Sequence, residues 1–383
     1  MKVAFYAPMK APTAPVPSGD RKIARLLWRA LQEAGHDVGL ASTFRSWDGR
    51  GDVARQRRLR GLGQRLAERL ARRYRGEPPA ARPAVWFSYH VYYKAPDWLG
   101  PAVSRALDIP YVIAEASYAP KHADSPWGMG LEAARAAITR CDRVIALKSC
   151  DIPCLLPLLG DRRRLVTLKP FLDTREYTVS DGRASARSVL RQCYGLDPAR
   201  PWLLTVAMMR EGNKLACYRV LAQALQGITE RRLSLLIAGD GPTRAEVEAA
   251  FAPLRGHHIV FAGLQPPDVL RAFYAAADLF VWPAVDEPFG MALLEAQAAG
   301  LAVVAGRSRG VPDVVSDGVT GLLAPPGDAG AFAGAVLALL DSPARASAMG
   351  AAGADLACRE HDIVGAAAAL DRILEQARQR GRR

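Results

Sequence analysis

Short apolar runs alternate with amphipathic stretches along most of the chain. In the first half, the runs at 2–7, 37–41 and 85–89 have the length of buried strands. Apolar residues recur at helical spacing from 21 to 34, and Gly35 follows as a left-handed helix cap. Further strands are predicted at 110–114 and 143–147, with helices near 96–107 and 129–140. This alternation predicts an α/β domain whose parallel sheet is covered by helices on both faces.

The second half repeats this pattern after a polar stretch. Strands are predicted at 202–207, 233–238, 259–261, 279–282 and 301–305, and a last amphipathic helix at 362–379. Two domains also suit a length of 383 residues. We therefore predict two Rossmann-like, doubly wound domains facing a central cleft, with the C-terminal helix packing back on the first domain. The predicted division is an N-terminal domain at 1–175, a linker at 176–200, a second domain at 201–360, and a C-terminal helix with a basic tail at 361–383.

The composition is that of an ordinary globular protein, with 50% hydrophobic and 23% charged residues. No apolar run reaches the ~18 residues of a membrane span. The apolar run at 2–7 is also too short for a signal peptide. We therefore expect a cytoplasmic location. Six scattered cysteines form no Cys-x2-Cys pair, which argues against a structural zinc site.

The most informative segment runs from Glu287 to Glu295 and contains Pro288-Phe289-Gly290. It follows a predicted strand and begins a helix. Pro288 suits a helix entry, and Gly290 lets a ligand approach the backbone. The free N–H groups of the first turn, around Gly290, Met291 and Ala292, would then bind a diphosphate. Carboxylates on either side of a diphosphate suit the hydroxyl groups of a sugar and a ribose, so the segment predicts a nucleotide-sugar site.

With this Glu-x7-Glu signature the chain resembles the family 4 retaining glycosyltransferases, which have the two-domain GT-B fold. The resemblance extends to Gly300 and on through Gly318, Thr320 and Gly321. It implies that Glu287 contacts the hydroxyls of the donor sugar and that Glu295 contacts the ribose. It also implies retention of the anomeric configuration, with no metal ion or other cofactor.

The resemblance also implies an Arg and a Lys after the first strand of the donor domain, which hold the diphosphate. Here Lys214 stands at the start of the next helix, and Arg210 takes the arginine role from a differently shaped loop. Cations there would stabilise the charge of the leaving nucleotide diphosphate. By analogy of fold, contacts to the nucleotide base come from the turns at 239–241 and 262–264, including Gly263 and Leu264.

The N-terminal half matches the family in part. Gly19 takes the position of one glycine in the loop after the first strand, and Asp20 replaces the second. Many members carry a histidine at the end of a later strand, and that histidine is absent from 111–118. The candidates for the acceptor side are therefore Glu115, His122 and His90. Packing of aromatic residues under a loop is the alternative for the segment around His90.

The excess positive charge, +13 overall, is concentrated between Arg50 and Arg75, where ten arginines and two acids give a net charge of +8. Leu59, Leu62, Leu66 and Leu70 recur at helical spacing within it, which predicts a basic amphipathic helix. Such helices often lie on anionic membranes, so we predict a peripheral membrane surface here. A leucine stripe facing the core with a solvated arginine face is the alternative. No nucleic-acid-binding motif accompanies the arginines, so we expect no nucleic acid partner.

We therefore predict a glycosyltransferase that moves a sugar from a UDP- or GDP-linked donor to a hydroxyl of a glycan or a lipid-linked acceptor, in the synthesis of cell-envelope glycans or glycolipids. The alternatives are an epimerase of nucleotide sugars with the same fold, and a non-catalytic, membrane-associated binding protein. A dinucleotide oxidoreductase is disfavoured because no Gly-x-Gly-x-x-Gly follows the first strand.

Overall fold

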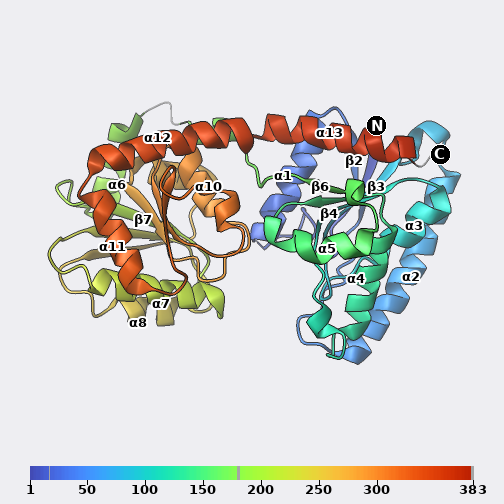
Figure 1. Ribbon diagram of the computed structural model, residues 1–383, viewed down its shortest axis with the longest axis horizontal. Helices are drawn as coiled ribbons and strands as arrows, with labels where there is room; N and C mark the ends of the chain where they lie inside the picture. Colours follow the sequence, from blue (N-terminus) through green and yellow to red (C-terminus); the bar gives the residue numbers. More distant parts are fainter. Residues whose placement is uncertain (17, 179–181, 381–383) are drawn as a thin grey trace. The chain divides into compact units, whose positions relative to one another are not determined.

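The computed structural model describes residues 1–16, 18–178 and 182–380. These residues form two compact units, and each is described by itself. Unit 1 comprises Met1–Lys169 and the C-terminal segment from Ile363, and unit 2 comprises Pro170–Asp362. Both units are parallel sheets with helices on their faces, as the alternating pattern predicted (Figure 1).

The sheet of unit 1 has the strand order β2-β1-β3-β4-β5-β6. The first strand therefore lies between the second and the third. From β1 the sheet extends to β2 on one side and to β3 through β6 on the other, so the strand order reverses at this point. Such a reversal is where doubly wound sheets bind ligands, outside the carboxyl ends of the strands. The strands are β1 (Lys2–Tyr6), β2 (Asp37–Ser42), β3 (Val85–Val91), β4 (Tyr111–Ala116), β5 (Arg143–Ala146) and β6 (Leu165–Thr167). The helices are α1 (Gly19–Glu33), α2 (Val53–Gly76), α3 (Gly100–Leu107), α4 (Gly128–Arg140), α5 (Ile152–Leu159) and α13 (Ile363–Arg380).

The sheet of unit 2 repeats this design with the order β12-β11-β10-β7-β8-β9. Its reversal point lies between β7 and β10, which are neighbours in the sheet. The strands are β7 (Trp202–Val206), β8 (Ser234–Ala238), β9 (His258–Gly263), β10 (Leu279–Trp282), β11 (Val303–Gly306) and β12 (Gly321–Ala324). The helices are α6 (Gly182–Tyr194), α7 (Asn213–Gln226), α8 (Arg244–Phe251), α9 (Pro267–Ala276), α10 (Met291–Ala298), α11 (Ala329–Leu340) and α12 (Pro343–Glu360).

The predicted linker at 176–200 differs from the structure. Residues 179–181 lie outside the described residues, but the rest of the segment belongs to unit 2 and contains α6. Helix α6 packs on α9, and the guanidinium of Arg187 lies 4.0 Å from the Trp202 ring centre and 3.1 Å from Asp278. Only Ala186 and Leu190 of this helix are buried. A helix with so small a buried face has a mostly polar sequence, which resembles that of a linker. The chain instead passes between the units at residues 169–170 and 362–363.

The C-terminal helix packs on unit 1, as predicted. Helix α13 lies along α1 and buries Ile363, Leu370 and Leu374 completely (Figure 1). The end of the predicted basic tail, 381–383, lies outside the described residues.

The arginine-rich segment is a helix, α2, but its buried face differs from the predicted leucine stripe. The buried positions include Gly63, Ala67, Leu70 and Tyr74, whereas Leu62 is 41% exposed. A Cβ at Gly63 would collide with Trp98, so this glycine allows a close approach. Small residues, rather than leucines alone, therefore decide which face of α2 packs on the unit.

Candidate functional site

The loop that follows β7 is held in place by the loop that follows β8. The amides of Ala207 and Met209 donate to the carbonyls of Ala238 and Asp240, at 3.1 and 3.0 Å. Any Cβ at Gly239 would collide with the Ala207 carbonyl, so only glycine permits this approach. These contacts fix where α7 begins, and thereby the position of Lys214 in its first turn.

The loop that follows β10 is shaped by two residues from other elements. Ser308 Oγ accepts the Glu287 N–H at 3.0 Å and donates to the Ala284 carbonyl. Cys217 Sγ, from α7, accepts the Val285 N–H at 3.2 Å. Ala284 has a φ of +47°, a conformation that is uncommon outside glycine and that clusters at functional sites. The loop therefore has one defined path, which ends at Glu287.

Lys214 and Glu287 meet at the reversal point of the sheet in unit 2. Lys214 Nζ lies 2.5 Å from Glu287 Oε2 and 5.1 Å from the ring centre of Trp282. Trp282 Nε1 donates to the same carboxylate oxygen at 3.3 Å. The lysine side chain is 34% exposed and the glutamate 15%, so both can be reached by a ligand. One cation and one hydrogen-bond acceptor are thus fixed side by side.

The start of α10 supplies backbone donors beside this pair. Gly290 adopts the left-handed conformation, with a φ of +67°, and no side chain caps this helix start in the described part of the chain. The first-turn amides of Met291 and Ala292 have no partner within the helix, because only later residues reach a carbonyl one turn back. Phe289 and Met291 are buried, and Ala292 is partly exposed. An uncapped helix start of this kind binds anions.

Glu295 lies deeper than Glu287. It is 5% exposed, and its Oε2 accepts a hydrogen bond from the Tyr274 hydroxyl at 2.8 Å. Burial and the charge of Glu295 raise the pKa of Tyr274 well above its ordinary value, so the hydroxyl stays a donor. The predicted ribose contact of Glu295 stays a prediction.

The other predicted donor residues lie on neighbouring loops. Arg210 is exposed, and its guanidinium lies 3.1 Å from Met208 Sδ. Gly263 ends β9 with a φ of +72°, and its carbonyl accepts the Gly239 N–H at 2.8 Å. Leu264 follows with 62% exposure. The structure thus brings Lys214 and Glu287 into contact, whereas the roles of these three residues stay predictions.

Two of the three acceptor-side candidates come together in unit 1. His90 and Glu115 lie at the carboxyl ends of the adjacent strands β3 and β4. His122 lies apart in a short 3-10 helix, Pro120–His122, where its ring stacks on Tyr93 at 4.3 Å. Gly19 begins α1, with open space where a Cβ would lie, and Pro17 of the same loop lies outside the described residues.

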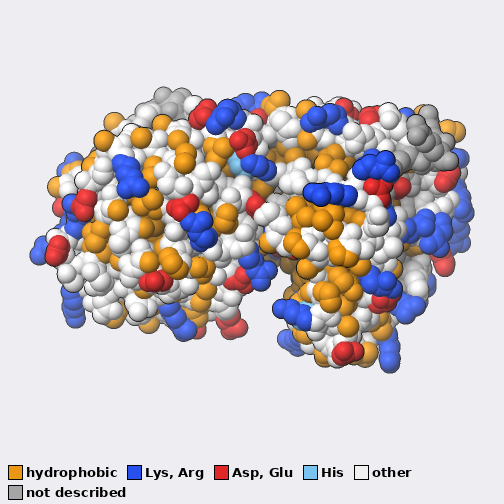
Figure 2. Space-filling view, in the orientation of Figure 1, with side chains coloured by type: hydrophobic (Ala, Val, Ile, Leu, Met, Phe, Trp, Pro, Cys, Tyr) orange, Lys and Arg blue, Asp and Glu red, His pale blue; other side chains and the backbone are white. Residues whose placement is uncertain are grey.

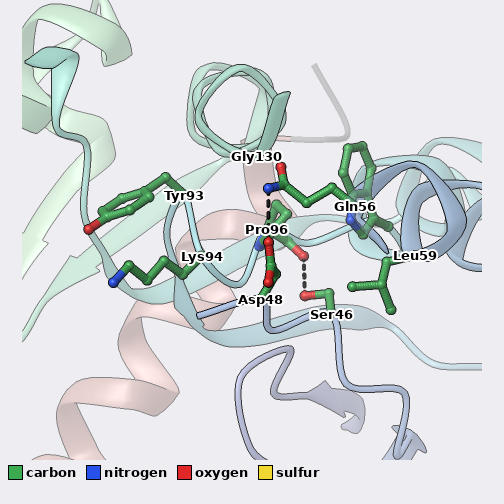
Figure 3. A pocket seen from close by; sticks show the side chains of 9 residues that line it. Ser46, Asp48, Gln56, Leu59, Tyr93, Lys94, Pro96 and Gly130 are labelled. Carbon is green, nitrogen blue, oxygen red and sulfur yellow. Dashed lines mark hydrogen bonds between the residues drawn. The ribbon is translucent and has the colours of Figure 1, made fainter. Parts of the chain in front are cut away.

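A small pocket of about 10 Å³ in unit 1 lies beside α2 rather than at the strand ends (Figure 3). Its polar groups bond to each other: Ser46 Oγ donates to the Pro96 carbonyl at 2.7 Å, and Gln56 Nε2 to Asp48 at 2.9 Å. A space of this size holds about one water molecule. The hydrogen bond from Gln56 joins α2 to the loop at Asp48. A space of about 10 Å³ is too small for a substrate.

Sequence reasoning missed the residues that position the motif. Ser308, Trp282, Tyr274 and Cys217 surround Glu287 and Glu295, yet none belongs to a recognised motif. Of these four residues, only Trp282 could be placed near the site from the sequence, because it is the last residue of the predicted strand 279–282.

No group of three or more His, Cys, Asp and Glu side chains is placed to hold a metal ion in 1–16, 18–178 and 182–380. Over the same residues, no helix combines the length and the apolar character that a bilayer crossing needs.

Known proteins resemble this chain in sequence and in fold. Residues 200–342 match the family model described as glycosyl transferases group 1. A GDP-mannose-dependent alpha-(1-6)-phosphatidylinositol monomannoside mannosyltransferase of Mycolicibacterium smegmatis is 35% identical over 51% of this chain and 52% of its own. A D-inositol 3-phosphate glycosyltransferase of Nocardia farcinica is 32% identical over 56% of this chain and 48% of its own. The chain thus spans about half the length of these curated relatives.

The fold similarity covers nearly the whole chain. The crystal structure of HepE from Anabaena in complex with UDP-glucose superposes with a TM-score of 0.70, at 19% identity, over 99% of this chain and 98% of that one. The matched family segment contains Lys214, Glu287, Gly290 and Glu295, the residues on which the resemblance to family 4 rested. Residues 200–342 thus match the group 1 glycosyl transferases in sequence, and the whole chain shares the fold of HepE.

Proposed function

We propose that this chain transfers a sugar from a UDP- or GDP-linked donor to an acceptor hydroxyl in the synthesis of a glycan or a glycolipid. The contact between Lys214 and Glu287, beside the uncapped start of α10, carries the proposal. Relatives named for GDP-mannose and a fold neighbour holding UDP-glucose support the donor class.

The geometry provides for both parts of a nucleotide sugar. Without a donor, Lys214 and Glu287 neutralise each other. A bound diphosphate would interact with the ammonium group of Lys214 and with the amides of Met291 and Ala292. These groups would stabilise the negative charge of the leaving group. Glu287, released from Lys214, would accept hydrogen bonds from the sugar hydroxyls. Because ammonium and amide groups supply the positive charge, the proposed reaction needs no metal ion.

The assay follows nucleotide release from UDP-glucose and from GDP-mannose, with D-inositol 3-phosphate, phosphatidylinositol monomannoside or a lipid extract as acceptor. Lys214→Ala should lower kcat by roughly 10²–10³-fold, the usual loss for one group that stabilises transition-state charge. Glu287→Gln should raise KM for the donor and lower kcat. Glu211→Gln, on the exposed loop before α7, is the matched control and should retain the rate.

The assay also separates the alternatives. Interconversion of sugars without nucleotide release would favour an epimerase. Tight donor binding with no chemistry under any acceptor would favour a binding protein. Unchanged rates in both Lys214→Ala and Glu287→Gln would refute the proposed site.

We also propose that α2 contacts an anionic membrane surface. Figure 2 shows Lys and Arg side chains at the right-hand edge, where Figure 1 draws α2. Six arginines of the helix are exposed and make no ion pair in the described part of the chain: Arg57, Arg58, Arg60, Arg65, Arg69 and Arg72. Leu62 and Val53 are exposed on the same helix, 41% each. Basic residues near a negatively charged bilayer are each worth about 1 kcal/mol.

Vesicle flotation tests this surface. Replacing Arg57, Arg58, Arg60 and Arg65 by Gln should abolish binding to phosphatidylserine vesicles, with no binding to phosphatidylcholine in either protein. The control removes the same charge from exposed arginines of unit 2: Arg219, Arg232, Arg255 and Arg345. Equal loss in both variants would mean a general charge effect and refute α2 as the surface.

A further inference from the structure

Unit 2 contains a pocket that the proposed function does not use. Its volume is about 220 Å³, far larger than the pocket of about 10 Å³ in unit 1. Pockets for drug-sized ligands usually measure about 300–1,000 Å³, so this one suits a smaller molecule. All of its lining residues belong to unit 2. They are Ala184, Arg187, Ser188, Arg191, Pro198 and Trp202.

The pocket lies at the opposite end of the sheet from the proposed donor site. Trp202 is the first residue of β7, and its N–H donates at 2.7 Å to Asp278, which directly precedes β10. Lys214 and Glu287 instead follow the carboxyl ends of these two strands. The five residues of β7 span about 16 Å. A ligand in the pocket would therefore occupy a site separate from that of the donor.

Four of the lining residues come from one face of α6. Positions 184, 187, 188 and 191 follow the spacing of three and four residues that places side chains together on a helix. Ala184 is small and leaves room beside the longer side chains. Arg187 and Arg191 lie one turn apart, so a single ligand can contact both of them.

The guanidinium of Arg187 is held in place by the protein itself. Its Nη1 donates to the Ala276 carbonyl at 2.9 Å and to Asp278 Oδ1 at 3.1 Å, and its Cζ lies 4.0 Å from the ring centre of Trp202. Within the described residues, Nε and Nη2 make no hydrogen bond. The side chain is 21% exposed, so a ligand can reach these donors.

Positive charge exceeds negative charge at this face of α6. Arg183 and Arg187 share one acid, because both contact Asp278. Arg191 is exposed, and its side chain makes no ion pair or hydrogen bond in the part of the chain that the structure describes. Three arginines and one aspartate give a net charge of +2. Like charges four residues apart repel each other on a helix, so a bound anion would relieve this repulsion.

The other walls supply a hydroxyl group and apolar surface. Ser188 is exposed, and its hydroxyl has no hydrogen-bond partner among residues 1–16, 18–178 and 182–380. Pro198 is apolar, and the neighbouring Asp197 lies 3.3 Å from Arg200, so this pair adds no net charge. The pocket thus offers guanidinium and hydroxyl donors to an anionic group.

We propose that this pocket binds a phosphate monoester through Arg187, Arg191 and Ser188. Guanidinium groups bind phosphate through pairs of parallel N–H···O bonds, which makes arginine a favoured partner of phosphate. A phosphate monoester carries about −1.5 to −2 charges at pH 7, which matches the net charge of this face of α6. The site goes beyond the proposed transfer reaction, and its test needs no turnover.

Two tryptophans report on the two sites separately. Trp202 Nε1 donates to the Asp197 carbonyl beside the pocket, whereas Trp282 Nε1 donates to Glu287 at the donor site. Inorganic phosphate, titrated into the whole protein, should shift the Trp202 indole signal in nitrogen–proton NMR until the pocket is saturated. A shift of the Trp282 signal alone would overturn the proposal. An equal Trp202 shift with sodium chloride at the same ionic strength would also overturn it.

Arg191→Gln removes the arginine that has no structural contact. It should raise the Kd for phosphate roughly 10–100-fold, the usual effect of losing one charged hydrogen-bond partner, and leave urea unfolding unchanged. Arg187 is unsuitable because it also joins α6 to Ala276 and Asp278. Arg219→Gln, at an exposed position of α7, is the matched control and should keep the wild-type Kd. Equal affinity of Arg191→Gln and wild type would overturn the proposal.

Two further probes distinguish a soluble phosphate monoester from a lipid headgroup. They are glucose 6-phosphate, followed by the Trp202 signal, and phosphatidic acid vesicles, followed by flotation in the variant that lacks the α2 arginines. A loss in Arg191→Gln confined to glucose 6-phosphate would support a soluble ligand, and one confined to the vesicles a lipid headgroup. Unchanged binding of both probes would overturn the proposed site.

Discussion

At the scale of single residues, the site depends on side chains outside the signature. Ser308 bonds two backbone groups of the loop after β10, and Cys217 bonds a third. These bonds hold the backbone at Glu287, and Lys214 and Trp282 then contact its carboxylate. The Glu-x7-Glu spacing could therefore identify the carboxylate, whereas its orientation depends on residues distant in sequence.

Ser308→Ala should expose this dependence. The hydroxyl is buried, and its loss leaves the Glu287 N–H and the Ala284 carbonyl without their partner. Unpaired buried groups cost about 1–3 kcal/mol, so the free energy of unfolding by urea should fall by that amount. Donor KM should rise as well. Ser347→Ala, at an exposed helix position, should change neither quantity.

At the scale of elements, the ends of strands and the starts of helices carry the chemistry. In both units the loops beside the reversal of strand order hold an acid and a base in contact: Asp20 with His90, and Glu287 with Lys214. Parallel strands bring such loops to one edge of the sheet, whatever their distance in sequence.

Adding a methyl group at Gly290, where α10 begins, should lower the stability of the protein. Gly290→Ala places a Cβ at a φ of +67°, 2.9 Å from Leu293 Cδ1. The left-handed conformation costs roughly 1–2 kcal/mol for alanine, and the free energy of unfolding should fall accordingly. Gly334→Ala is the matched comparison, because that helical glycine of α11 is exposed and has open space around it. It should stabilise the protein by up to about 1 kcal/mol, and destabilisation there would contradict this account.

At the scale of the whole molecule, unit 1 is built from two segments distant in sequence, whereas unit 2 is one continuous stretch. Unit 1 needs α13, which follows all of unit 2 in the chain. Its buried residues complete the packing of α1, so the stability of unit 1 depends on the last helix described.

Leu370→Ala should therefore weaken unit 1 selectively. Leu370 is fully buried, and truncation of such a leucine costs about 2–5 kcal/mol. Hydrogen exchange of β1 and β3 amides should accelerate, while β7 and β8 amides keep their protection. Val364→Ala, on the same helix but 58% exposed, should alter exchange in neither unit.

The docking of α13 should also depend on pH through His36. This buried histidine lies 3.4 Å from Asp371 of α13 and 3.3 Å from the N-terminal amine. Burial, and then the N-terminal charge, lower the pKa of His36 below its ordinary 6.5. The unfolded chain thus binds the proton more readily, so stability is fully present above pH 6.5 and falls as the pH drops below it. His36→Asn should remove this part of the pH dependence in urea unfolding, and an unchanged slope would contradict the assignment.

The sequence by itself determined the two α/β halves, the order of their elements and the Glu-x7-Glu segment, because apolar periodicity and motif spacing are local properties. Tertiary structure decided the unit boundaries, the buried face of α2 and the contacts of Glu287, His90 and Asp20. Asp20 looked only like a missing glycine until folding brought it beside His90, 70 residues away. Packing depends on which surfaces fit together in space, and no stretch of sequence contains both surfaces.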